Sequence, residues 1–241
     1  MDRQLRMTPS WLALGIGFGL QAAGAATTPW PEVPDPPKAK VEWVARDSVI
    51  NGLPSRIEKF ESQLSMAEVL TYYRAFWANS PSGKPRENKM GEWNTLTTLQ
   101  GPFQIALQVQ SKGKQGSFGV ISIANFGEAN KDFYPKSMPK WSDAKVLQVM
   151  ESDDGPKHSQ YVVVASRESL DFNIQRSREE WQRRGFNLVR ESKPDPGGAP
   201  SWVASFDKEG ASLDVTVARS DRYRATTVTT NLVTPAKGVT W

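Results

Sequence analysis

The feature that most constrains the fold of this chain is a strand, turn, strand and helix pattern that occurs twice. In the first copy, two apolar segments flank Asn51-Gly52, and Asn-Gly supplies the positive φ angles that a tight hairpin turn needs. In the second copy, two similar segments flank Asp153-Asp154-Gly155-Pro156. Each copy therefore predicts a β-hairpin that leads into a helix.

The first predicted helix has a clear start signal. Ser65 and Glu68 form an S-x-x-E capping box, which satisfies free backbone N–H groups in the first turn. The apolar residues that follow recur at helical spacing and form one face: Met66, Val69, Leu70, Tyr73 and Trp77.

The second predicted helix corresponds to the first in position. It follows Ser169 and is expected to end at Gly185, a typical stop residue. Ser65 and Ser169 are 104 positions apart, as are Trp77 and Trp181. This matching offset favours an internal duplication.

Alternating strands follow each helix, beginning at Trp93 and at Trp202. Because apolar and polar residues alternate, antiparallel sheets with one solvated face are expected. We predict an α+β fold of two similar β-β-α-β-β-β units, residues 41–126 and 146–233, each with an antiparallel sheet covered by one helix. Residues 127–145 form an aromatic and proline-containing linker, which packs against one half or across both, and residues 234–241 form a tail.

The N-terminus has the pattern of an export signal. Arg3 and Arg6 precede an apolar run that closes on small residues, and Ala23 to Ala25 match the A-x-A cleavage pattern. The run is too short and too rich in glycine for a membrane anchor, which needs about 20 apolar residues. We predict a signal peptide over residues 1–25, a mature chain without a transmembrane segment, and a periplasmic or, alternatively, secreted location.

A proline-rich segment follows the predicted cleavage site. Five prolines lie within residues 26–40, so an extended tether is expected there. Trp30, which two prolines flank, is a candidate docking residue for a partner.

The chain has no cysteine and one histidine, His158. The usual zinc ligand sets are therefore excluded, and neither a nucleophile elbow nor a glycine-rich phosphate loop occurs. No metal and no cofactor is expected, and His158 is interpreted as a solvated loop residue.

Arginines form two clusters that could bind an anionic partner. The candidate partner-binding residues are Arg176, Arg183 and Arg184 on the second helix, and Arg219, Arg222 and Arg224 at the final hairpin turn. A charge-mixed solvated face is the simpler interpretation. If the clusters converge, they would suit an acidic glycan, a lipid surface or an acidic protein; nucleic acid is disfavoured by the expected location.

These features predict an exported, non-enzymatic binding or assembly module of the bacterial cell envelope, such as an accessory of a secretion, pilus or surface machine. Sheet edges and tryptophan-bearing grooves would recognise the partner, by strand addition or aromatic docking. The alternative is an exported hydrolase that uses paired carboxylates on a glycan or peptide. A third hypothesis is a self-associating structural protein.

Overall fold

The computed structural model describes residues 29–113, 116–192, 201–220 and 223–236. The predicted signal peptide, Arg222 and residues 237–241 of the predicted tail lie outside the described residues. All described helices and strands belong to the unit Pro31–Trp241. None of the described helices is long and apolar enough to cross a bilayer.

The first half of the chain contains two strands, a helix and four further strands. They are β1 (Ala39–Ile50), β2 (Leu53–Ser62), α1 (Met66–Phe76), β3 (Arg86–Met90), β4 (Trp93–Gln100), β5 (Phe103–Ser111) and β6 (Ser117–Asn125), followed by one short 3-10 helix (Phe126–Glu128).

The second half contains the same kinds of element in the same order. They are β7 (Ala144–Asp154), β8 (Lys157–Ser166), α2 (Leu170–Arg183), β9 (Asn187–Ser192), β10 (Ser201–Lys208), β11 (Ala211–Ser220) and β12 (Ala225–Pro235).

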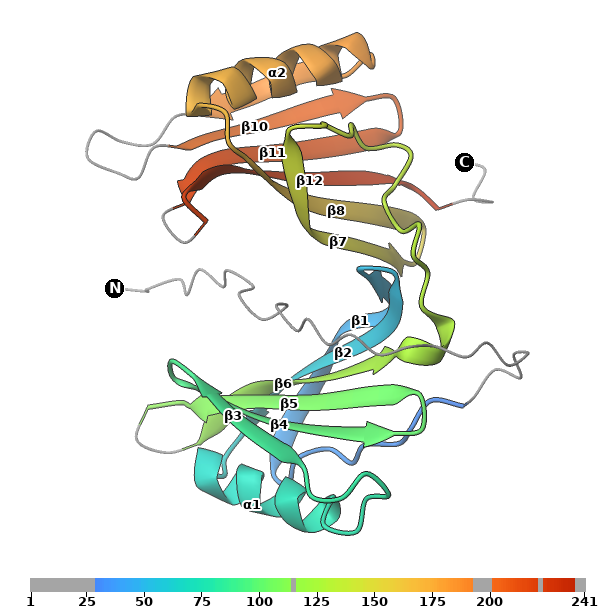
Figure 1. Cartoon of the computed structure of the whole chain (residues 1–241), viewed down its shortest axis with the longest axis vertical. Helices are drawn as coiled ribbons and strands as arrows, with labels where there is room; N and C mark the ends of the chain where they lie inside the picture. Colours follow the sequence, from blue (N-terminus) through green and yellow to red (C-terminus); the bar gives the residue numbers. More distant parts are fainter. Residues whose placement is uncertain (1–28, 114–115, 193–200, 221–222, 237–241) are drawn as a thin grey trace. The chain divides into compact units, whose positions relative to one another are not determined.

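In the described residues, all the strands form one 12-stranded antiparallel sheet (Figure 1). Its order is β3-β4-β5-β6-β2-β1-β7-β8-β12-β11-β10-β9. β1 and β7 join the halves, because Ser48 to Ile50 pair with Met150 to Ser152.

The α+β prediction of two separate sheets, each covered by one helix, was wrong. Strands take 56% and helices only 14% of the described residues, so the protein is mostly β. The sequence pattern does not predict β3 or β9, because these short strands lie at the ends of the sheet and lack alternating apolar residues. Nor does it predict that β1 and β7 pair, because both have hairpin partners of their own.

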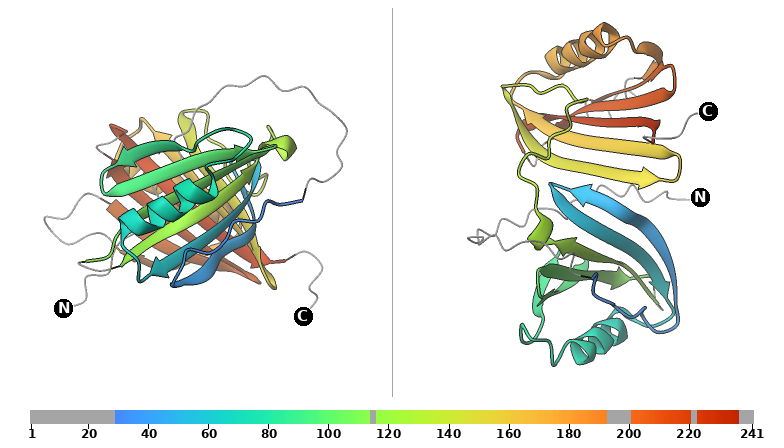
Figure 2. Two further views of the ribbon diagram at one scale, coloured as in Figure 1. Left: turned by 90° about the horizontal axis from the view of Figure 1, so that it is seen from below. Right: turned by 90° about the vertical axis from the view of Figure 1, so that its right-hand side faces the viewer.

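The core of the first half lies between α1 and the sheet. Alternate residues of β5 are buried, and α1 packs against β4, β5 and β6, as the left view of Figure 2 shows. On α1, Tyr73 and Trp77 are buried with their ring centroids 5.0 Å apart. The buried residues of the predicted helix face are Val69, Leu70, Tyr73 and Trp77.

The second half has an equivalent core. α2 contacts β9, β10, β11 and β12, and Trp181 meets Phe186 edge to face with 5.3 Å between ring centroids. Linker aromatics Phe133, Tyr134 and Trp141 pack against this core. Phe133 also lies beside the β1–β2 turn, since a Cβ at Gly52 would be 3.1 Å from the Phe133 Cβ, so the linker contacts both halves.

Local start and stop signals are confirmed at both helices. The hydroxyl of Ser65 accepts from the Glu68 N–H, and the Ser65 N–H donates to the Glu68 carboxylate, as a capping box requires. Gly185 has a φ of 84° and follows Arg184, the C-cap of α2. Asn51 and Gly52 have φ angles of 50° and 80°, as the predicted turn requires.

The described part of the proline-rich segment is held against the first half. The Tyr73 hydroxyl donates to the Pro34 carbonyl at 2.7 Å, and the Ser62 hydroxyl donates to the Pro37 carbonyl at 2.9 Å. Pro36 is buried. β1 begins at Ala39, so it includes the last two residues of the predicted tether.

Candidate partner-binding groove along α2

One end of the sheet is the short strand β9. β9 pairs only with β10, so its outer edge has no strand partner among the described residues. A register shift between Ser205 and Phe206 of β10 interrupts the pairing, and Val189 of β9 is 63% exposed. An edge of this kind presents backbone N–H and C=O groups to which another chain can bind.

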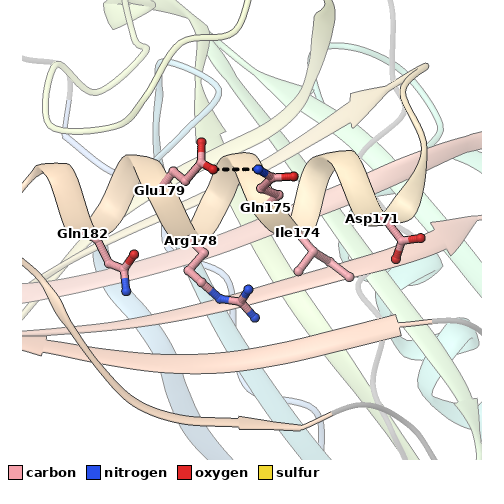
Figure 3. Close-up of a pocket in the computed structure, with 6 residues that line it drawn as sticks. All are labelled: Asp171, Ile174, Gln175, Arg178, Glu179 and Gln182. Carbon is pink, nitrogen blue, oxygen red and sulfur yellow. Dashed lines mark hydrogen bonds between the residues drawn. The ribbon is translucent and has the colours of Figure 1, made fainter.

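A groove runs along α2 on the side of β9. Its lining residues recur every three or four positions, which places them along one side of the helix. They are Asp171, Ile174, Gln175, Arg178, Glu179 and Gln182 (Figure 3). The Gln175 amide donates to the Glu179 carboxylate at 2.8 Å, and Arg178 extends from the helix away from this pair.

Arg178 connects the groove to β9. Its guanidinium forms an ion pair with Glu191, and the indole N–H of Trp202 donates to the same carboxylate oxygen at 2.7 Å. The Arg178 guanidinium also lies 5.6 Å from the centroid of the Trp202 ring. The Nε atom of Arg178 is buried and has no hydrogen-bond partner among the described residues.

A similar ion pair joins α1 to β3 in the first half. Arg74 donates from Nε and Nη2 to both oxygens of Glu87, at 2.7 and 2.9 Å. These hydrogen bonds hold the pKa of Glu87 below its ordinary value. In the second half, Arg178 donates from Nη2 to the Glu191 oxygen that also accepts from the indole N–H of Trp202.

Arg176, a predicted partner-binding residue, makes several contacts within the protein. Its guanidinium lies 3.9 Å from the centroid of Trp141 and donates to Asp143 and Asn173 at 2.6 Å each. Burial opposes ionisation of Asp143, but the hydrogen bond and charge of Arg176 lower its pKa overall. Only 18% of the Arg176 side chain is exposed.

Arg183 and Arg184 share one carboxylate. Both form ion pairs with Glu180, and Arg184 also donates to the Ser137 carbonyl at 2.7 Å. The pKa of Glu180 lies below its ordinary value. Burial opposes this shift, but the hydrogen bonds and charges of the two arginines outweigh the effect of burial. The charges of these arginines are therefore partly neutralised within the protein.

Arg184 lies far from the final hairpin turn, whereas Arg176 lies toward it: the Arg176 guanidinium is 3.5 Å from the Ser166 hydroxyl, and Ser166 pairs with Thr226, the strand partner of Arg219. Lys208 donates to the Arg184 carbonyl at one end of α2, whereas Thr226, close to Arg224, donates to the Glu168 carbonyl before the other end. α2 has 14 residues, so these ends are about 21 Å apart. Arg219 and Arg224 are exposed, Arg222 lies outside the described residues, and Trp30 is partly buried.

The interpretation of His158 as a solvated loop residue was wrong. His158 lies on β8, with Nδ1 2.8 Å from Asp153 and Nε2 3.3 Å from Glu151. Among the described residues, no group of three or more histidine, aspartate or glutamate side chains is placed to hold a metal ion.

Arg178 and Glu191 are a linked pair that the sequence pattern did not predict. A signal for them is present, because Arg74 and Arg178 are 104 positions apart, as are Glu87 and Glu191. This is the offset that relates Trp77 to Trp181. The offset relates the two arginines and the two glutamates to each other, but only the structure shows that they form ion pairs.

The chain shows little similarity to known proteins. No family model matches the chain, and no curated protein matches it. The chain is similar to a solved structure described as the immunity protein TplEi of T6SS from Pseudomonas aeruginosa complexed with an "L" peptide. The identity is 12%, the match covers 85% of this chain and 84% of that chain, and the TM-score is 0.30.

Proposed function

We propose that this protein is an exported, non-enzymatic binding module of the bacterial cell envelope. It binds an extended segment of another envelope protein by adding that segment to the outer edge of β9. A role as an accessory of a secretion, pilus or other surface machine is consistent with this proposal.

The observation that carries the proposal is the combination of a free edge strand and an adjacent helix groove. Strand addition takes its affinity from main-chain hydrogen bonds and its specificity from pockets that receive alternate side chains. The outer edge of β9 offers main-chain hydrogen-bonding groups, and the groove along α2 offers a pocket for side chains. α2 contacts β9 directly, so one bound segment could use both.

The envelope location is supported by the first 25 residues of the sequence. Two arginines, a short apolar run and the A-x-A pattern together favour export and cleavage. The location within the envelope is proposed as the periplasm, with secretion as the alternative.

Photocrosslinking in the cells that make the protein tests the proposal. A photoreactive residue at Val189 of β9 should capture one discrete envelope protein. In the crosslinked product, this protein should lack its own residues 1–25. The matched control position is Leu99, an apolar residue on β4 that is 53% exposed.

Capture from Leu99 but not from Val189 would contradict the binding surface. Recovery of the unprocessed chain in the cytosol would contradict the location. Turnover of a glycan or peptide by the purified protein would replace the proposal with the hydrolase alternative.

A further inference from the structure

We infer that the segment bound at β9 and α2 is basic, with two lysine or arginine side chains four positions apart. This inference rests on the proposed function, because it assigns the chemistry of the partner at the same site.

The charges along the groove are the first argument. Arg178, the cation among the lining residues, is paired with Glu191. Asp171 and Glu179 have no ion-pair partner among the described residues, and both are exposed. The groove therefore presents two carboxylates that no cation of the described protein neutralises, which favours a cationic ligand.

The spacing of these carboxylates is the second argument. Asp171 and Glu179 are eight residues apart on α2, which corresponds to about 12 Å along the helix axis. In an extended segment, side chains four residues apart lie on the same face at a separation of about 13 Å. Two basic side chains at positions i and i+4 of a bound strand therefore match the two acids.

The other arginines at α2 do not make the charge of the groove positive. Arg176 is paired with Asp143, and Arg183 and Arg184 are both paired with Glu180. The anionic partner considered from the sequence would need these cations to be free. The structure instead favours a basic partner at this surface.

A selection of random octapeptides displayed on phage tests the inference, with the protein purified after expression of the full-length chain. Enriched sequences should carry lysine or arginine four positions apart. A synthetic peptide of the enriched sequence should bind the D171K/E179K variant about tenfold more weakly, and the loss should shrink at high salt.

Two further variants separate a local effect of these carboxylates from a general effect of net charge. D171N/E179Q removes the charges without reversing them and should show a smaller loss. D154K/E92K makes the same change in net charge at exposed turn and strand-end positions away from α2 and β9, and should bind as the unmodified protein does.

Enriched peptides without a basic bias, or equal losses in D171K/E179K and D154K/E92K, would overturn the inference while leaving peptide binding, and with it the proposed function, in place. Failure to enrich any peptide would also overturn it. Capture of a partner at Val189 in cells then decides the proposed function separately.

Discussion

Asn51 and Val149 hydrogen-bond to each other twice, although they are 98 residues apart in the sequence. The Asn51 N–H donates to the Val149 carbonyl at 2.8 Å, and the Val149 N–H donates to the Asn51 side-chain carbonyl at 2.8 Å. The Asn51 side chain thus takes the place of a backbone acceptor and continues the β1–β7 pairing beyond the end of β1. The turn between β1 and β2 is therefore part of the connection between the two halves.

Replacing Asn51 by glycine should separate the two roles of this residue. Glycine tolerates the φ of 50°, so the turn should persist, but the N–H of the buried Val149 would lose its acceptor. We expect a loss of about 2 kcal/mol in the free energy of unfolding, measured by urea denaturation. Asn51→Asp keeps an acceptor at this position and should lose much less; equal losses in both variants would contradict the account.

Gly52→Ala should be far more destabilising than Gly155→Ala. Both glycines have positive φ, but a Cβ at Gly52 would lie 2.0 Å from the Asn130 carbonyl oxygen, whereas a Cβ at Gly155 meets nothing within 4 Å. Gly155→Ala should cost only the strain of the left-handed conformation, about 1 kcal/mol. Thermal unfolding of the two variants measures the difference, and similar melting temperatures would show that the Gly52 turn does not pack closely against Asn130.

Arg176→Ala should destabilise the fold, whereas Arg183→Ala should not. Arg176 stacks on Trp141 and is paired with Asp143, so its loss should lower the free energy of unfolding by about 2 kcal/mol. The Arg183 side chain is 75% exposed, and its loss should change the stability by less than about 0.5 kcal/mol. If urea denaturation ranks the two variants in the opposite order, Arg176 has been assigned the wrong role.

Glu58 should make the stability of the protein depend on pH. Burial raises its pKa, the charge of Asp35 raises it further, and Arg46 opposes both. A carboxyl group whose pKa is higher in the folded than in the unfolded state favours folding at low pH, and this contribution is lost as the pH rises through the folded-state pKa.

Glu58→Gln removes this titration. The variant should therefore gain stability relative to the unmodified protein as the pH rises from about 4 to about 7. Urea denaturation at the two pH values measures the difference, and a difference that stays constant with pH would contradict the effect.

Local features were predictable from the sequence because short-range rules determine them. The capping box at Ser65, the turn at Asn51 and the helix end at Gly185 depend on residues that are close together in the chain. The pairing of β1 with β7 was not predictable, because it joins Ser48 to Ile50 with Met150 to Ser152, far along the sequence. The joining of all strands into one sheet follows from that long-range contact.

The candidate site was harder to predict than the fold. The arginines of α2 were predicted to form a basic cluster. In the structure their charges are paired with Asp143, Glu180 and Glu191, which lie up to 33 positions away in the sequence. A sequence shows charges but not their partners. The exposed acids Asp171 and Glu179 became significant only once these pairs were known.

The strand-addition claim is tested most directly by methylating, one at a time, the backbone nitrogens of the peptide that binds the purified protein. In an added strand, every second residue directs its N–H toward the neighbouring strand. The account predicts that methylation weakens binding at alternate positions and is tolerated between them. Equal effects at all positions, or losses that recur every three to four residues as in a bound helix, would contradict it.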